Sequence, residues 1–66
     1  MTLKQIREQK SLTQSQLAKL VGVHQTYISR IERKKRKPRI DIAIEIAKAL
    51  GVTVEELFGT DDKHED

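Results

Sequence analysis

A chain of 66 residues has room for one small hydrophobic core, so we expect a single domain. It lacks cysteine, which excludes disulfides and thiolate zinc sites, and no apolar run approaches the roughly 20 residues that span a membrane. The net charge is +3, but residues 1–39 carry +9 and residues 40–66 carry −6, which favours a polyanion as partner of the first part. The first residues lack the apolar stretch of a secretory signal, and we therefore expect a cytoplasmic protein.

Three capping boxes, each a threonine followed three residues later by Gln or Glu, predict the starts of helices. They are Thr2 with Gln5, Thr13 with Gln16 and Thr53 with Glu56. The first predicts a helix over residues 3–10 that buries Leu3 and Ile6, and the second predicts a helix over residues 14–21. The apolar stripe of the second helix, at helical spacing, consists of Leu17, Ala18, Leu20 and Val21.

A third helix is expected over residues 25–33, with His24 as its N-cap. It follows the second closely, because Gly22 tolerates the positive φ that ends a helix and Val23 resumes the apolar pattern. The apolar side of this helix consists of Tyr27, Ile28 and Ile31. The opposite, polar side covers about 140° of arc and consists of Gln25, Thr26, Ser29, Arg30 and Arg33.

Residues 30–39 form a strongly basic segment with seven Lys or Arg, and Pro38 prevents a helix from continuing through it. A fourth helix is predicted over residues 40–50 and ends at Gly51. Its isoleucines alternate as in a strand, but a helical stripe outweighs that pattern, and it consists of Ala43, Ala47 and Leu50. Ile42 is then the odd apolar residue, expected to be partly exposed.

The end of the chain is divided into a short helix and a tail. We expect a fifth helix over residues 54–58, which completes a domain that spans residues 1–59. Residues 60–66 are polar and acidic, and we expect this tail to be disordered.

Ala18, Gly22 and Ile28 have the spacing of a helix-turn-helix unit: a small residue at the helix crossing, a turn, and an apolar side chain between the two helices. Together with the stretches LTQSQLAKLVGV, TYISRIER, KP and IAKALGVTVEELF, the chain resembles the helix-turn-helix DNA-binding domains of phage-repressor type (Cro/repressor-like, xenobiotic-response-element family). The resemblance covers nearly all of the chain except the acidic tail. It implies an all-α fold, a compact five-helix bundle of lambda-repressor-like type, with the helix-turn-helix in the second and third helices.

The resemblance also implies a sequence-specific transcriptional regulator, most simply a repressor, that binds double-stranded DNA at an inverted repeat as a homodimer, with the third helix in the major groove. By matching position, the residues expected to contact bases are His24, Gln25, Thr26, Ser29 and Arg30. Gln25 can bond N6 and N7 of adenine, and Arg30 can bond O6 and N7 of guanine or a phosphate. Phosphate contacts are expected from Gln14, at the N-terminus of the second helix, and from Tyr27, Arg33, Lys35, Arg36, Lys37 and Arg39.

The same resemblance implies a structural ion pair between Arg7 and Glu32, which would tie the third helix to the first. It leaves two roles open for Val54, Leu57 and Phe58, which either fill the core or lie at a dimer interface.

The chain departs from the family pattern at four positions. Ser11 and Lys34 replace glycines that follow helix ends, where left-handed geometry would cost roughly 1 kcal/mol, unless Lys34 extends the helix or alters the loop. His24 replaces the usual Ser or Thr cap, and Arg39 replaces a common Ser.

A protein-interaction module can share this fold, and an exposed apolar patch that includes Ile42 would favour a protein partner, with or without DNA. An enzyme is not expected, because the chain has no Gly-rich phosphate loop, no H-E-x-x-H and no cysteine, and the adjacent Glu55 and Glu56 point in different directions. We expect no cofactor, no small-molecule ligand and no metal, since His24 and His64 stand without other ligand residues.

Overall fold

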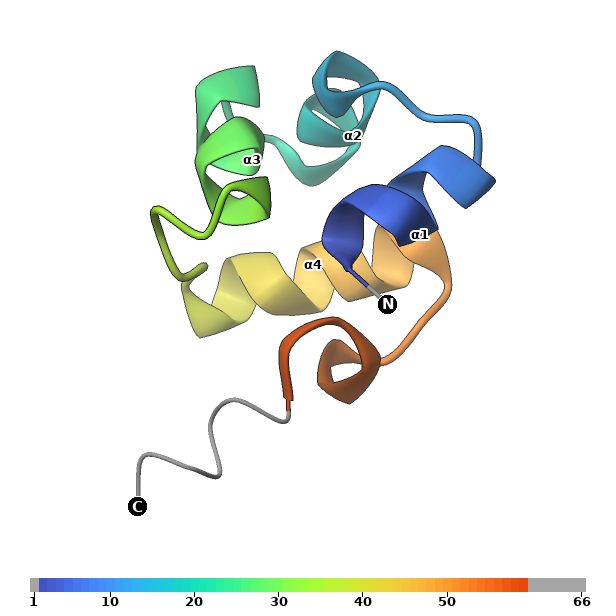
Figure 1. Cartoon of the computed structure of the whole chain (residues 1–66), viewed down its shortest axis with the longest axis vertical. Helices are drawn as coiled ribbons and strands as arrows, with labels where there is room; N and C mark the ends of the chain where they lie inside the picture. Colours follow the sequence, from blue (N-terminus) through green and yellow to red (C-terminus); the bar gives the residue numbers. More distant parts are fainter. Residues whose placement is uncertain (1, 60–66) are drawn as a thin grey trace.

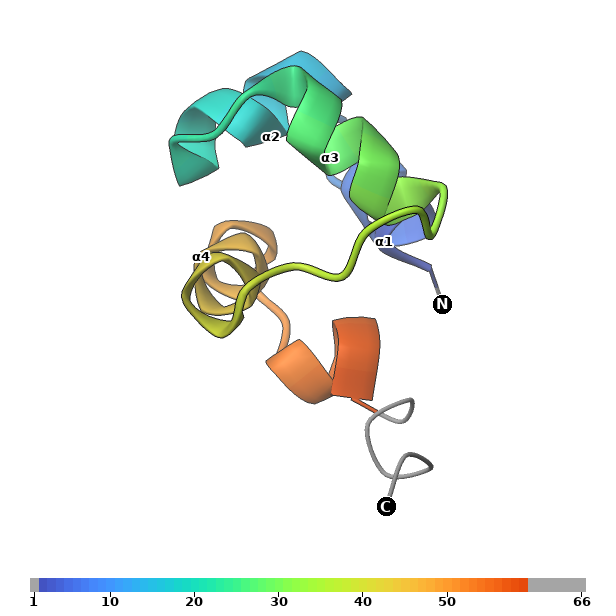
Figure 2. The same cartoon turned by 90° about the vertical axis from the view of Figure 1, so that its left-hand side faces the viewer.

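The computed structural model describes residues 2–59, so the tail expected over residues 60–66 lies outside the described part. Its elements are α1 (Leu3–Gln9), α2 (Gln14–Val21), α3 (Gln25–Glu32), α4 (Ile40–Leu50) and the π-helical turn η1 (Glu55–Gly59). In Figure 1, α2 and α3 lie side by side at one end, α4 crosses beneath them, and η1 lies on the far side of α4. The view in Figure 2 agrees with this arrangement. The predicted all-α fold with five helical elements is confirmed.

All three capping boxes form. The Thr2 side chain accepts a hydrogen bond from the Gln5 backbone N–H at 3.1 Å, and the Gln5 side chain accepts from the Thr2 N–H at 2.9 Å. The equivalent distances are 3.0 and 2.9 Å at Thr13 and 3.0 and 2.8 Å at Thr53. His24 caps α3 through Nδ1, which accepts from the Thr26 N–H at 3.1 Å. These bonds satisfy backbone donors that a helix start leaves without intrahelical partners.

Each α-helix closes on a residue in the left-handed region. These residues are Ser11 (φ 60°), Gly22 (φ 87°), Lys34 (φ 60°) and Gly51 (φ 71°). At the end of α3 the Lys35 N–H donates to the Arg30 carbonyl at 2.8 Å and the Lys34 N–H to the Ile31 carbonyl at 3.0 Å, which is a Schellman motif. Lys34 therefore does not extend the helix. Because of this closure, α1 and α3 each end one residue earlier than predicted, at Gln9 and Glu32.

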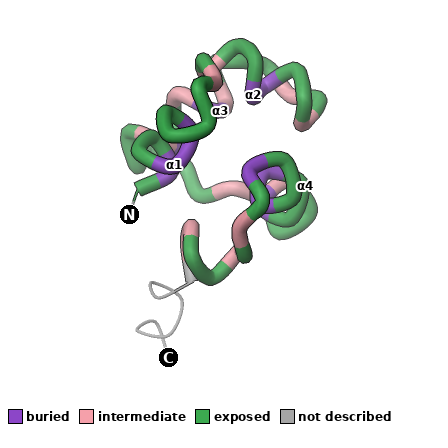
Figure 3. The backbone as a smooth tube through the Cα atoms, turned by 90° about the vertical axis from the view of Figure 1, so that its right-hand side faces the viewer, coloured by how far each residue is buried: buried purple, intermediate pink, exposed green. Residues whose placement is uncertain are grey.

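The core lies where α1, α2 and α3 face α4. Its fully buried side chains are Leu17, Ile28, Ile46 and Leu50. α1 adds Leu3 and Ile6 to the same cluster. In Figure 3, buried positions follow the inward sides of these helices. α2 packs against both α3 and α4, so α3 is held on the bundle through α2.

The apolar residues that face solvent differ in part from the predicted stripes. Leu20 is 62% exposed, because it lies about 100° around α2 from Val21, beyond the edge of the buried face. On α4, Ile40 is 70% and Ile44 40% exposed, whereas Ile42 is half-buried and packs against the core. Ile42 is therefore only partly exposed, as predicted, and it shares the buried face with Ile46, one turn further along.

The last element begins one residue later than predicted and is a π-helical turn over Glu55–Gly59, with Val54 in a helical conformation before it. Leu57 and Phe58 are half-buried and pack against the core. No helix within residues 2–59 combines the length and apolar character that crossing a membrane requires.

Candidate nucleic-acid interface

One side of α3 is polar and accessible. Gln25, Thr26 and Arg30 are exposed, Ser29 is half-buried, and His24 is exposed at the N-cap. These are the five residues that the sequence assigns to base contacts, and the structure brings them onto one helix face and its cap. The opposite side of α3 buries Ile28 and Ile31 in the core. A helix held on one side and polar on the other has the form needed to enter the major groove of DNA.

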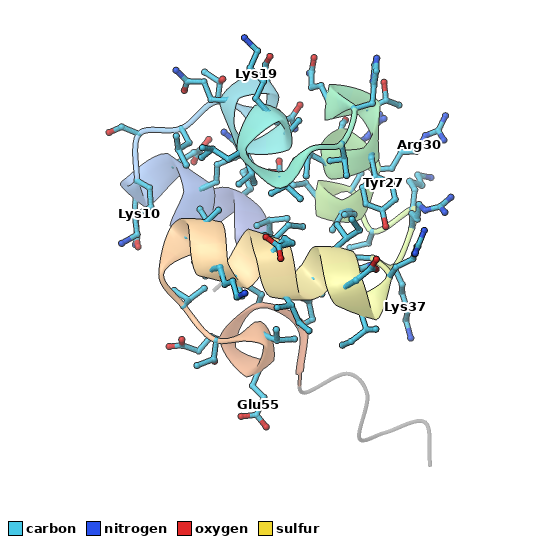
Figure 4. All side chains as sticks on the ribbon, turned by 180° about the vertical axis from the view of Figure 1, so that it is seen from behind. Lys10, Lys19, Tyr27, Arg30, Lys37 and Glu55 are labelled. Carbon is cyan, nitrogen blue, oxygen red and sulfur yellow. The ribbon has the colours of Figure 1, made fainter. Side chains whose placement is uncertain are left out.

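The basic segment after α3 lies beside this face. Every Lys and Arg from Arg33 to Arg39 is exposed, including the predicted phosphate-contact residues Lys35, Arg36 and Lys37. Figure 4 shows Arg30, Tyr27 and Lys37 along one side of the molecule, with Glu55 at its lower end and Lys10 on the opposite side. The seven cations of residues 30–39 thus lie beside the polar face of α3, where positive charge attracts phosphate.

Tyr27 anchors the basic segment to α3. The guanidinium of Arg36 lies 5.1 Å from the centre of the Tyr27 ring, and the Tyr27 hydroxyl accepts a hydrogen bond from the Arg39 backbone N–H at 3.1 Å. The hydroxyl can still donate its own proton, so a phosphate contact remains compatible with this bond. The Arg39 side chain pairs with Asp41 at 3.1 Å, but both side chains are largely exposed, so the pair is weak and easily exchanged.

A buried ion pair joins α3 to α1. The Nε of Arg7 donates to Oε2 of Glu32 at 2.6 Å and its second terminal nitrogen to Oε1 at 3.2 Å. The first terminal nitrogen donates to the Leu12 carbonyl at 2.6 Å. The side chains are only 8% and 4% exposed. The hydrogen bond that Arg7 donates to Glu32 raises the pKa of Arg7, and this effect outweighs the lowering effect of burial.

Gln14 has contacts that the sequence did not indicate. Its Nε2 donates to Oε1 of Glu32 at 2.9 Å, and its Oε1 accepts from Nε2 of Gln25 at 3.1 Å. The sequence placed Gln14 on a phosphate through the N-terminus of α2, and that expectation is not tested by these contacts. No local pattern could have found them, because the partners lie 18 and 11 residues away along the chain.

Val54, Leu57 and Phe58 are all half-buried, and the last two pack against the core of their own chain. A role of these residues at a dimer interface stays a prediction. Within residues 2–59, no group of three His, Cys, Asp or Glu side chains is placed to hold a metal ion.

Comparison with known proteins places this geometry in a family. The sequence profile of a helix-turn-helix family matches residues 3–57. The chain is 44% identical over 48 residues to the control protein C.SmaI of Serratia marcescens, covering 73% of this chain and 57% of that protein. An uncharacterized HTH-type transcriptional regulator of Methanocaldococcus jannaschii is 42% identical over 60 residues, with 91% of each protein covered. The immunity repressor protein of Bacillus phage phi105 is 35% identical over 57 residues, which cover 86% of this chain and 40% of the repressor.

Among solved structures, the SinR protein/SinI protein complex contains a chain that matches with a TM-score of 0.81 and 32% sequence identity. That match covers 97% of this chain and 63% of the other. The chain spans 57% of the control protein and 37% of an uncharacterized regulator of Mycobacterium tuberculosis.

Proposed function

The chain belongs to the helix-turn-helix family of Cro and phage-repressor type, a family of DNA-binding transcriptional regulators rather than enzymes, and we propose that it represses transcription as a homodimer bound to an inverted repeat in DNA. The observation that carries this proposal is the polar, accessible face of α3 beside a segment of exposed cations. Two relatives are named a control protein and an immunity repressor, which supports regulation by occupying an operator.

Base contacts in this proposal come from α3. Gln25 carries an amide that can bond adenine at N6 and N7, and Arg30 can bond guanine at O6 and N7 or a phosphate. Thr26 and Ser29 reach bases or thymine methyl groups. His24 uses Nδ1 to cap α3, so a neutral ring carries its proton on Nε2 and keeps one donor for the DNA.

Phosphate contacts position the protein without reading sequence. The proposed donors are the N-terminus of α2 at Gln14, the Tyr27 hydroxyl and the side chains of Arg33, Lys35, Arg36, Lys37 and Arg39. Their attraction to the DNA backbone depends on salt, because binding releases condensed counterions. Selectivity for one sequence must then come from the face of α3.

The dimer is proposed to form through Val54, Leu57 and Phe58. η1, which carries Leu57 and Phe58, lies on the side of α4 opposite α2 and α3 (Figure 1). Two copies would then leave both α3 helices free to face DNA, about 34 Å apart in successive major grooves.

The test is selection of bound duplexes from a random DNA pool at about physiological salt. We expect an inverted repeat with half-sites about one helical turn apart. The Gln25→Ala variant should bind that site about 1–3 kcal/mol more weakly and lose selectivity at one base position. Recovery of no motif, with binding that vanishes at modest salt, would refute sequence-specific binding.

A second candidate function is protein binding. Ile40 and Ile44 expose apolar surface on α4, and the matched structure is titled as a complex of two proteins. This function would be favoured if the DNA selection fails and the protein sediments as an assembly larger than one chain. Ile40→Ser and Ile44→Ser should then abolish that assembly.

A further inference from the structure

Tyr27, the single tyrosine of the chain, holds the basic segment after α3 at two points. The guanidinium of Arg36 lies over its ring, 5.1 Å from the ring centre, and its hydroxyl accepts a hydrogen bond from the Arg39 N–H at 3.1 Å. Tyr27 itself is half-buried and packs against the core. One side chain fixed in the bundle therefore contacts both the middle and the end of a segment whose cations are all exposed.

The start of the segment is fixed in a different way. The Lys35 N–H donates to the Arg30 carbonyl at 2.8 Å, which is a backbone bond of the motif that closes α3. The position of Lys35 is therefore set without Tyr27, whereas the side chain of Arg36 is held by the Tyr27 ring. The six Lys and Arg of residues 33–39 repel one another, and the contact with the ring opposes the spreading of Arg36 that this repulsion favours.

The contact with the ring leaves Arg36 able to bind a further group. A guanidinium has five N–H donors, and its attraction to the face of an aromatic ring is not a hydrogen bond to an acceptor oxygen. Arg36 can therefore keep its contact with Tyr27 while its N–H groups bind a phosphate oxygen. Part of the conformational freedom that an unrestrained arginine loses on binding is already lost in the unbound protein.

We propose that Tyr27 is a positioning residue for Arg36, whose guanidinium it holds ready for a DNA phosphate before DNA binds. This inference rests on the proposed function, in which the basic segment contacts the DNA backbone. Arg30 follows Tyr27 by three residues and lies along the same side of the molecule (Figure 4). The phosphate contact of Arg36 is thereby held beside the face of α3 that is proposed to read bases.

The test is a double-mutant cycle on the affinity for a DNA duplex, in which Tyr27→Leu is combined with Arg36→Ala. Any duplex that the protein binds is suitable, because a phosphate contact does not depend on sequence. Tyr27→Leu keeps an apolar side chain against the core and removes the ring. The loss of affinity caused by Arg36→Ala should be roughly two- to tenfold smaller in the Tyr27→Leu protein than in the wild type, because an unrestrained arginine must be ordered on binding. Equal losses in the two proteins would overturn the inference.

Two matched variants separate the ring from other effects of Tyr27. Lys35→Ala should cause the same loss of affinity, within about twofold, in the wild type and in the Tyr27→Leu protein. A Lys35 cycle as strong as the Arg36 cycle would mean that Tyr27 only supports the fold of the segment, and would overturn the inference. Tyr27→Phe keeps the ring, so Arg36→Ala should lose as much affinity in that protein as in the wild type. A smaller loss there would assign the effect to the hydroxyl and overturn the role of the ring.

NMR of the free wild-type protein tests the contact without any variant or DNA. Protons above the face of an aromatic ring are shielded, so the δ-methylene protons of Arg36 should resonate upfield of those of Arg33, and equal positions would overturn the inference. The difference should persist in Tyr27→Phe and vanish in Tyr27→Leu.

The outcomes distinguish this inference from the proposed function. If Arg36→Ala leaves the wild-type affinity unchanged, the proposed phosphate contact fails and the inference fails with it. If Arg36→Ala weakens binding equally in the wild type and in the Tyr27→Leu protein, the inference alone fails.

Discussion

Backbone strain at the ends of α1 and α3 leads to a stability prediction. Ser11 is exposed and adopts φ 60°, where an L-residue pays about 1–2 kcal/mol and glycine pays none. Glycine in turn gains freedom in the unfolded chain, which offsets roughly 0.5–1 kcal/mol. Ser11→Gly should therefore raise the free energy of unfolding by about 0.5–1 kcal/mol. For a domain of this size the midpoint of thermal unfolding should rise by roughly 4 °C.

The reverse change and a matched control complete the experiment. Gly22 adopts φ 87°, and no heavy atom lies within 4 Å of a Cβ added there. Gly22→Ala takes on the same strain and loses the same unfolded-chain freedom in reverse, so it should lower the free energy of unfolding by about 0.5–1 kcal/mol, without a clash. Ser11→Ala keeps an L-residue at the left-handed position and should change stability by less than about 0.5 kcal/mol. Thermal unfolding followed by circular dichroism measures all three variants. A lower midpoint for Ser11→Gly, or no loss for Gly22→Ala, would refute the reasoning.

Three further predictions concern the ion pair and the basic segment. Arg7→Met leaves the carboxylate of Glu32 buried without its guanidinium partner, so the free energy of unfolding measured in urea should fall by about 3–5 kcal/mol. A fall of less than about 1 kcal/mol would contradict the importance of the pair. Tyr27→Phe removes the hydroxyl that accepts from the Arg39 N–H, so that amide should exchange its hydrogen faster, and unchanged exchange would argue against the anchor. Lys35→Ala should lower the magnitude of the slope of log affinity against log salt by about 1. Lys10→Ala is the control and should leave this slope unchanged. If the two variants change the slope equally, Lys35 is not a phosphate contact.

The starts of the helices could be predicted from sequence, because a capping box is local chemistry. Thr2, Thr13 and Thr53 each find their partner three residues away, and that spacing is visible in the sequence. The turn at Gly22 was predictable for the same reason, since few residues tolerate its φ. The ends of α1 and α3 were predicted one residue too late, at Lys10 and Arg33, because nothing in a serine or lysine by itself indicates left-handed geometry. Only the resemblance, which places glycine at positions 11 and 34, pointed to that geometry.

The side-chain network behind α3 could not be predicted from spacing. Gln14 and Glu32 meet only after α2 and α3 have packed, and their bond depends on the rotamers of two long side chains. The same limit applies to Leu20, which has the composition of a core residue but lies beyond the edge of the buried face. Local patterns therefore predict the helices and the composition of the polar face of α3, whereas the orientation of each side chain on that face depends on tertiary packing.

Insertion of α3 into the major groove is tested most directly by NMR on the isotope-labelled protein with a duplex recovered by selection. We predict that signals of α3 and of residues 33–39 change most, and that the Gln25 side-chain amide shows a direct contact with an adenine. Changes confined to α4 and η1, with the signals of α3 unmoved, would contradict DNA binding through this helix.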